Sequence, residues 1–220
     1  MTKVLAILSE KGGAGKTTFT VHIAVAAHLA GLSVAILDTD AQQASAADWC
    51  DRRGTEPEGV ALPHARLTKT IADLRANETD LVIIDTGRDN NSAAYAAAEA
   101  ADLCVIPIQP GGFDVRALKL SIDVCRLAGK RPFAVVNGTQ PGAKLKVADA
   151  WDTLAGFQCE VAPVVLPRRD VFRAASITTK TAQETEPGST AAQEVRQLYD
   201  WIAGQLQLST TGQPDIKASA

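Results

Sequence analysis

A glycine- and lysine-rich run near the N-terminus contains the residue types that most clearly indicate chemistry. It reads Ser-Glu-Lys-Gly-Gly-Ala-Gly-Lys-Thr-Thr over residues 9–18. Glycines allow a tight turn that aims successive backbone N–H groups at phosphate oxygens, and a helix that follows adds the positive end of its dipole. In this pattern the lysine neutralises β- and γ-phosphate charge, and the threonine hydroxyl after it binds Mg²⁺. The run therefore predicts a nucleotide-binding loop formed by Gly12, Gly13, Ala14, Gly15, Lys16, Thr17 and Thr18.

Such a loop needs a strand before it and a helix behind it, and the rest of the chain repeats that alternation. Apolar runs rich in Val and Ile occur at 4–8, 34–37, 81–84, 103–108, 133–136 and 161–166. Helix-length segments occur at 17–30, 42–53, 68–76, 91–101, 113–128, 143–155 and 190–207. Continuous apolar runs are typical of strands buried on both faces. The alternation predicts a doubly wound α/β fold, a mostly parallel sheet with helices on both faces and ligands at the carboxyl ends of its strands.

Length, composition and charge narrow the class of protein. The 220 residues are 46% hydrophobic and 21% charged, which is enough to bury a full-sized core. We expect one domain over residues 1–207 and a small, polar, disordered tail over 208–220. The net charge of -3 excludes a globally basic protein that coats nucleic acid, and no apolar run is long enough to span a membrane. Four widely spaced cysteines favour reduced, buried thiols in a cytoplasmic protein over metal or redox chemistry.

The segment Lys-Gly-Gly-Ala-Gly-Lys-Thr at 11–17 resembles the deviant phosphate loop of the ParA/MinD ATPases. Glu10 stands where the general phosphate-loop pattern has glycine, and a larger polar residue there is more typical of ParA-like members. The resemblance implies that Lys11 reaches across a dimer interface to the partner's nucleotide. A cation supplied in this way couples dimerisation to ATP and stabilises charge in phosphoryl transfer. We therefore expect an ATP-bound homodimer in which Lys11 and Lys16 are catalytic.

Two acidic motifs follow the loop in the order that the family has them. Asp-Thr-Asp-Ala-Gln at 38–42 resembles the family's Asp-x-Asp-Pro-Gln, with alanine in place of proline. The match implies that Asp40 positions or activates the attacking water and that Asp38 supports the magnesium shell. Asp85 ends the run at 81–84 as the Walker B acid does, and would hold Mg²⁺ through water. The alternative for each acid is a helix N-cap or a turn residue. After Thr86 the chain departs from the family with Gly-Arg-Asp-Asn at 87–90.

Two further positions match the family's base-binding residues. Asn137 ends the run at 133–136 and matches a residue that contacts adenine, for which an amide is chemically suited. Pro167 follows the run at 161–166 where the family packs an apolar wall against the base. Asn137 is also compatible with an ordinary turn.

Positive charge concentrates in the C-terminal half of the chain. Residues 124–148 carry five basic side chains and no acid before Asp149. Residues 165–180 carry four more, with one acid among them. Each of these residues is compatible with an ordinary solvated helix face. The resemblance favours a non-specific DNA-binding face instead, since ParA-like members bind DNA when ATP dimerises them. The candidate contacts are Arg168, Arg169 and Arg173.

Together these features predict an Mg²⁺- and ATP-dependent, ParA-like partition ATPase. We expect it to bind the nucleoid as an ATP dimer, to be stimulated by a ParB-like or other small DNA-binding adaptor, and to segregate plasmid or chromosome DNA. One alternative is a MinD-like protein that cycles on a membrane, although residues 208–220 contain only two large apolar residues and cannot form an amphipathic helix. A positioning ATPase for a protein cargo is equally compatible with the motifs. A metabolic phosphate-loop enzyme is disfavoured by the Lys11 signature and by the short chain.

Overall fold

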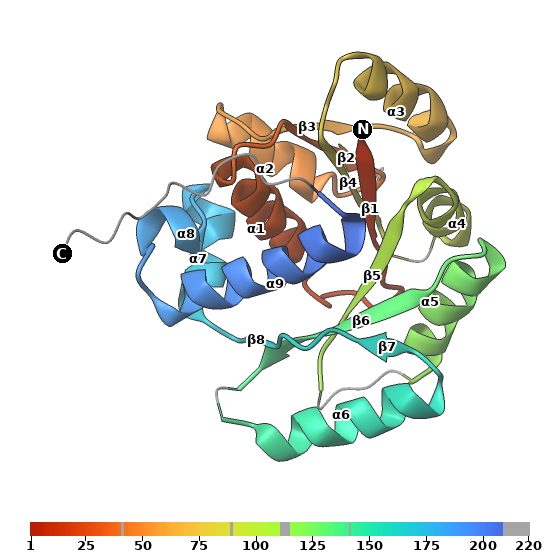
Figure 1. Ribbon diagram of the computed structural model, residues 1–220, viewed down its shortest axis with the longest axis vertical. Coiled ribbons are helices and arrows are strands. Elements are labelled where there is room, and N and C mark those ends of the chain that lie inside the picture. Colours follow the sequence, from red (N-terminus) through yellow and green to blue (C-terminus); the bar gives the residue numbers. More distant parts are fainter. Residues whose placement is uncertain (41, 89, 111–114, 141, 209–220) are drawn as a thin grey trace.

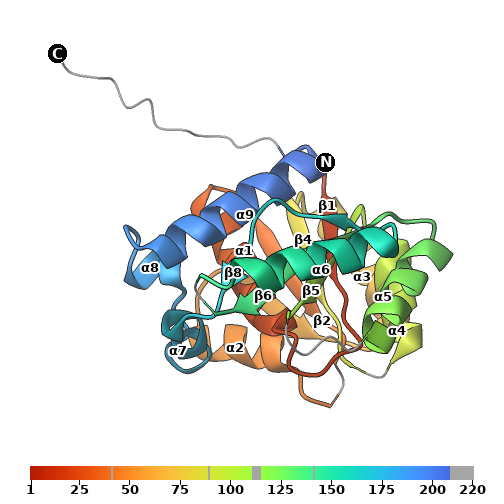
Figure 2. The same ribbon diagram turned by 90° about the horizontal axis from the view of Figure 1, so that it is seen from below.

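A parallel β-sheet forms the middle layer of the molecule, and helices cover both of its faces (Figures 1 and 2). The computed structural model describes residues 1–40, 42–88, 90–110, 115–140 and 142–208. The strands are β1 Lys3–Ile7, β2 Val34–Asp38, β3 Glu58–Ala61, β4 Leu81–Asp85, β5 Leu103–Ile108, β6 Pro132–Thr139, β7 Glu160–Val161 and β8 Leu166–Pro167. They lie in the order β3-β2-β4-β1-β5-β6-β7, with β8 also paired to β6, and every pairing is parallel. The predicted doubly wound α/β fold is therefore confirmed.

The helices fall into two groups, one on each face of the sheet. They are α1 Lys16–Leu29, α2 Ser45–Arg53, α3 Leu67–Ala76, α4 Asn91–Ala100, α5 Val115–Leu127, α6 Lys144–Gly156, α7 Asp170–Thr178, α8 Ala182–Thr185 and α9 Thr190–Leu206. Residues of α1, α2, α7, α8 and α9 share one buried cluster, and residues of α3, α4, α5 and α6 share the other. None of the helices in the described part of the chain is long and apolar enough to cross a membrane.

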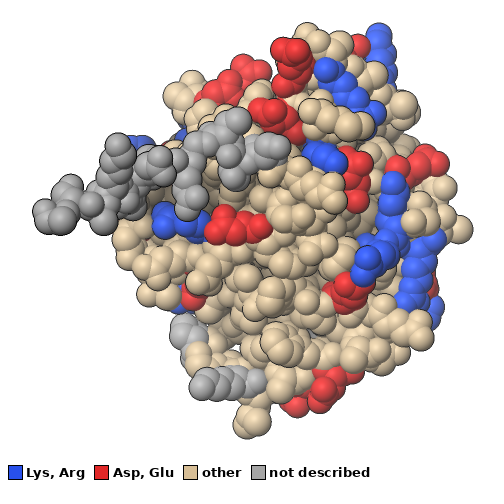
Figure 3. Space-filling view, in the orientation of Figure 1, with Lys and Arg blue, Asp and Glu red and all other residues tan. Residues whose placement is uncertain are grey.

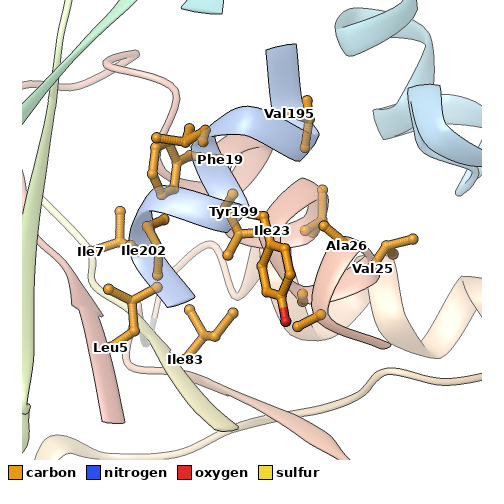
Figure 4. Close-up of a cluster of buried hydrophobic side chains, with 14 of the residues drawn as sticks. Leu5, Ile7, Phe19, Ile23, Val25, Ala26, Ile83, Val195, Tyr199 and Ile202 are labelled. Atoms are coloured by element: carbon orange, nitrogen blue, oxygen red, sulfur yellow. The ribbon is translucent and has the colours of Figure 1, made fainter. Parts of the chain in front are cut away.

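Alternate side chains of the central strands enter the two clusters in turn. Along β1, Leu5 and Ile7 join the cluster beneath α1 and α9, whereas Val4 and Ala6 join the cluster on the opposite face. Figure 4 shows the first cluster, where these two β1 residues and Ile83 lie against side chains of α1 and α9. Because both faces of each central strand are buried, the side chains that point to either face must be apolar. This explains why the strands appear in the sequence as continuous apolar runs.

The edges of the sheet differ from the prediction. The expected strand over 161–166 is wrong, because two short strands, β7 and β8, pair with different parts of β6. Pro163 lies between them and lacks the N–H that a ladder needs. Strand β3 and helices α7 and α8 were not expected. The predicted tail lies outside the described residues from 209 onward, as does the start of the helix expected over 113–128.

Candidate functional site

The carboxyl ends of three neighbouring strands meet at one pocket. In the sheet Ile7 of β1 lies opposite Asp85 of β4, which in turn lies opposite Asp38 of β2. The chain leaving β1 turns over these ends and enters α1 at Lys16. A pocket of about 220 Å³ lies there, lined by Gly12, Gly13, Ala14, Gly15, Lys16, Thr17, Thr18, Asp38, Asp40, Gln43, Ser45, Asp85, Thr86 and Arg88. The fold thus brings the predicted loop and all three predicted acids together.

Glycines shape the loop where other residues would not fit. Gly13 and Gly15 have φ angles of 74° and 88°, in the left-handed region that L side chains rarely adopt. A Cβ on Gly15 would also lie 2.5 Å from Nδ2 of Asn137. Gly15 precedes α1 and supplies no side-chain cap, so the first N–H groups of that helix remain available to an anion.

Two carboxamides from neighbouring strands hold the outer side of the loop. Gln109, which follows β5, donates from Nε2 to the carbonyl oxygen of Gly13 at 2.8 Å. Asn137 on β6 donates from Nδ2 to the carbonyl oxygen of Ala14 at 2.9 Å. Fixing these carbonyls on one side of the loop directs the N–H groups of the same peptide planes to the other side. Sequence reasoning missed Gln109, whose signal was its place at the end of a buried strand.

The base-binding prediction for Asn137 and Pro167 remains a prediction. The Asn137 amide N–H is used by the phosphate loop, as the bond to Ala14 shows. Pro167 lies half-buried in β8, where it pairs with Thr139 of β6 beyond the position of Asn137. Both positions therefore lie at the carboxyl end of β6, and Asn137 contacts the loop.

Lys16, Thr17 and Asp85 place two charged groups and a hydroxyl in the pocket. Lys16 Nζ donates to the carbonyl oxygen of Ser9 at 2.8 Å, and the Thr17 hydroxyl donates to Oδ2 of Asp85 at 2.7 Å. Asp85 is 3% exposed, and burial together with the nearby charge of Asp38 raises its pKa to about 7. Burial also lowers the pKa of Lys16, although three nearby carboxylates oppose this shift.

These residues fit a magnesium ion. Oδ1 of Asp85 is fully buried and has no hydrogen bond of ordinary geometry among the described residues, with the Thr20 hydroxyl as its nearby polar neighbour. A carboxylate with one oxygen unsatisfied and a raised pKa is stabilised by a nearby cation. Mg²⁺ prefers hard oxygen ligands and commonly takes one or two from protein and the rest from phosphate and water. Thr17 and Asp85 supply such oxygens beside the loop.

Asp38 and Asp40 each shape the turn between β2 and α2. Asp38 is 1% exposed and accepts N–H groups from Asp40 at 2.9 Å, Ala46 at 2.8 Å and Ala47 at 3.2 Å. Its carboxylate therefore accepts N–H groups of the first turn of α2 from outside that helix, whose N-cap residue is Ala44. Oδ1 of Asp40 accepts the N–H groups of residues 42 and 43, both at 3.1 Å, and the residue lines the pocket. The predicted role of Asp38 toward magnesium and that of Asp40 toward water remain predictions.

The departure at 87–90 has a structural reason. A Cβ on the buried Gly87 would lie 3.1 Å from Cγ of Asp40, so a side chain there would require Asp40 to move by a few tenths of an ångström. The next residue, Arg88, lies over the phosphate loop, with Nη1 3.0 Å from where a Cβ on Gly12 would be. The sequence showed the departure but not that it places an arginine at the pocket.

The three arginines predicted to contact DNA differ in their surroundings. Arg168 and Arg173 are exposed. The guanidinium of Arg169 forms a two-point ion pair with Glu194 of α9, at 2.5 and 2.6 Å, and so joins α9 to the segment before α7. The predicted DNA contacts of all three arginines remain predictions.

Three basic residues of the earlier segment also bind within the chain. Arg126 and Lys130 donate to the backbone carbonyl oxygens of Phe157 and Ala101, and Arg131 forms an ion pair with Glu160. On the face shown in Figure 3, basic and acidic side chains lie close to one another rather than forming a uniform basic surface. The basic side chains that gather on the right of this view have acidic side chains at their margins.

Comparison with known proteins supports the geometry. Residues 5–176 match the model of the CobQ/CobB/MinD/ParA nucleotide binding domain. A maintenance of carboxysome distribution protein A from Gloeobacter kilaueensis is 38% identical over 118 residues, 53% of each chain, so the match spans about half of that relative. Its namesake from Halothiobacillus neapolitanus is 26% identical over 208 residues, 90% of this chain and 95% of that one. The MinD cell division protein of Aquifex aeolicus superposes with a TM-score of 0.75 at 19% identity, over 92% of this chain and 97% of that one. The family model covers well over half of the sequence, and the chain belongs to the CobQ/CobB/MinD/ParA nucleotide-binding family.

Proposed function

We propose that this protein binds ATP with Mg²⁺ and hydrolyses it. The observation that carries this proposal is the convergence of a glycine-shaped loop, a lysine and a buried, incompletely satisfied aspartate in one pocket. Lys16 would neutralise phosphate charge, and Thr17 and Asp85 would hold the metal ion, which stabilises charge as the phosphoryl group transfers. Asp40 faces the same pocket and would orient the attacking water.

The test is Mg²⁺-dependent ATP hydrolysis by the parent protein and by Asp40→Asn. The amide keeps an oxygen for the N–H groups of residues 42 and 43 but removes the negative charge. We expect kcat to fall about a hundredfold or more, with ATP affinity unchanged within about threefold. Lys16→Ala should instead lose ATP affinity.

The matched control is Asp51→Asn, which removes an exposed carboxylate on α2 and should hydrolyse ATP as the parent does. Parental turnover in Asp40→Asn would contradict the role given to Asp40. A parent that neither binds nor hydrolyses ATP would contradict the proposed function itself.

We further infer that the hydrolysis cycle positions a cargo. Plasmid or chromosome partition, with an ATP-bound homodimer on non-specific DNA and an adaptor that stimulates hydrolysis, rests on the ParA-like loop. A protein assembly is the second candidate cargo, favoured by the near full-length match to a carboxysome distribution protein. Lys16→Ala in the host distinguishes the two. Faster plasmid loss supports partition, whereas clustered protein bodies with a stable plasmid support a protein cargo.

A further inference from the structure

Arg88 occupies a position that joins two pockets. It lines the phosphate pocket and also a neighbouring pocket of about 280 Å³, whose lining includes Asp40 and Gln43. Asp40 and Gln43 line both pockets as well. Arg88 therefore lies at the same end of the phosphate pocket as the acid expected to orient water, and the two pockets meet there.

The approach of Arg88 depends on two glycines. Gly12 has no side chain, so the guanidinium lies against the loop backbone, with Nη1 and Cδ 3.0 and 3.4 Å from where a Cβ would be. Gly87 lets the preceding backbone pass Asp40, where a Cβ would be 3.1 Å from Cγ and 3.3 Å from Cα. Gly12 opens the phosphate loop, whereas Thr17 and Thr18 lie at its other end in α1. A phosphate chain that lay along the loop from α1 toward Gly12 would end beside Arg88.

We propose that Arg88 binds the terminal phosphate of a nucleoside triphosphate held by its own protomer, and thereby discriminates triphosphate from diphosphate. Guanidinium is planar, stays charged at every physiological pH and donates two parallel hydrogen bonds to phosphate oxygens. It would act from the β4 side of the pocket, opposite the α1 dipole. The inference rests on the proposed function, because it concerns the same nucleotide.

The experiment compares Mg²⁺-bound non-hydrolysable ATP analogue with ADP, titrated by calorimetry into the parent, Arg88→Ala and Arg88→Lys. We expect Arg88→Ala to lose about tenfold or more of its affinity for the analogue and less than twofold for ADP, as for a lost charge-assisted pair. Arg88→Lys keeps the charge but not the planar guanidinium, so its affinity for the analogue should lie between those of the parent and Arg88→Ala. Arg75→Ala removes an exposed arginine on α3 and should match the parent for both ligands.

Equal losses for the two nucleotides would overturn the inference, since they would indicate a structural role for Arg88. Unchanged affinity for both would overturn it as well, while leaving the proposed function in place. A parent that binds neither nucleotide would overturn the proposed function together with the inference.

Discussion

His22 shows how burial makes one residue a source of pH dependence. It lies on α1 at 2% exposure, with Nδ1–H donated to the carbonyl oxygen of Thr18 at 2.8 Å and its ring edge-on to Phe172. Nε2 has no partner among the described residues. Burial lowers the pKa of His22 to about 4, from an ordinary value of 6.5. Between pH 6.5 and 4, His22 therefore stays neutral in the folded protein, whereas the same imidazole takes up a proton in the unfolded chain.

The sign of the effect follows from this difference. Between pH 6.5 and 4 the unfolded state binds more protons, so stability contributed by His22 is present above pH 6.5 and is lost as pH falls toward 4. Because the raised pKa of Asp85 changes stability in the opposite sense over the same range, the effect of His22 is the difference between the parent and a His22→Leu variant, which we expect to reach about 3 kcal/mol by urea unfolding. His22→Leu retains the apolar volume without a titrating group, and its stability should fall less with pH. Parallel pH profiles for the two proteins would refute this assignment.

Asp85 could be predicted from the sequence as a residue of the pocket, whereas Arg88 could not. The phosphate loop was predictable because its residues are contiguous, so composition and spacing alone determine its geometry. Asp85 was predictable because it ends a buried strand beside that loop. Gln109 and Arg88 reach the loop only through folding, and the pairing of Arg169 with Glu194, 25 residues away, was not predicted. Contacts between distant segments leave no local signal.

The packing of α2 on β3 leaves no room at one position. A Cβ on Gly59 would lie 2.6 Å from Sγ and 3.0 Å from Cβ of Cys50. We expect Gly59→Ala to destabilise the protein by about 1–3 kcal/mol, because a buried contact of this length forces a backbone or side-chain shift. Thermal or urea unfolding measures the change.

Two variants make this test specific. Gly188→Ala is the matched control, since nothing lies within 4 Å of its added methyl group, and it should unfold as the parent does. Cys50→Ala removes the obstructing sulfur, so the double variant with Gly59→Ala should be more stable than the sum of the single effects predicts. Strict additivity would show that α2 and β3 are not in contact there.

The elements themselves were predictable in proportion to their burial. Strands β1, β4, β5 and β6 are enclosed by helices on both faces and appear as apolar runs in the sequence. Strand β3 is a half-exposed edge with the sequence Glu-Gly-Val-Ala, which has no such run. Helix α7 buries only Phe172 and Ala175, too few to reveal a helical period.

The proposed ATP-dependent dimerisation is a property of the whole molecule, and a Lys11→Ala variant tests it. We expect Lys11→Ala to reduce the dimer fraction with a non-hydrolysable ATP analogue, because it removes a cation supplied to the partner's nucleotide. Light scattering measures the fraction, and circular dichroism should show an unchanged monomer fold. Lys69→Ala, on the exposed side of α3, serves as the control. A mutant dimer fraction equal to that of the parent would assign Lys11 a role within its own loop.

The proposed DNA binding would also belong to the assembled protein, since we expect a chain of net charge -3 to bind duplex weakly through one small patch. Arg168→Ala/Arg173→Ala should weaken ATP-dependent binding to random duplex and lower the magnitude of its salt slope by about two for each protomer. Arg169→Ala should lower stability instead, because it leaves Glu194 unpaired. Affinity for DNA that does not depend on ATP or salt, or a double variant with parental affinity, would contradict the proposed DNA-binding face.

The position of the pocket on the sheet has a consequence for how its two ends fluctuate. Strands β1 and β4 are central and buried on both faces, so their amide hydrogens should exchange with solvent only when the whole protein unfolds. Strand β8 has two residues, one of them a proline without an N–H, and pairs only with β6, so the amide hydrogen of Leu166 should exchange through local opening. The phosphate pocket is thus attached to the slowest-exchanging part of the chain, whereas Pro167, the predicted base contact outside that pocket's lining, belongs to a fast-exchanging part. A bound nucleotide would meet a fixed wall at its phosphates and a compliant one at its other end.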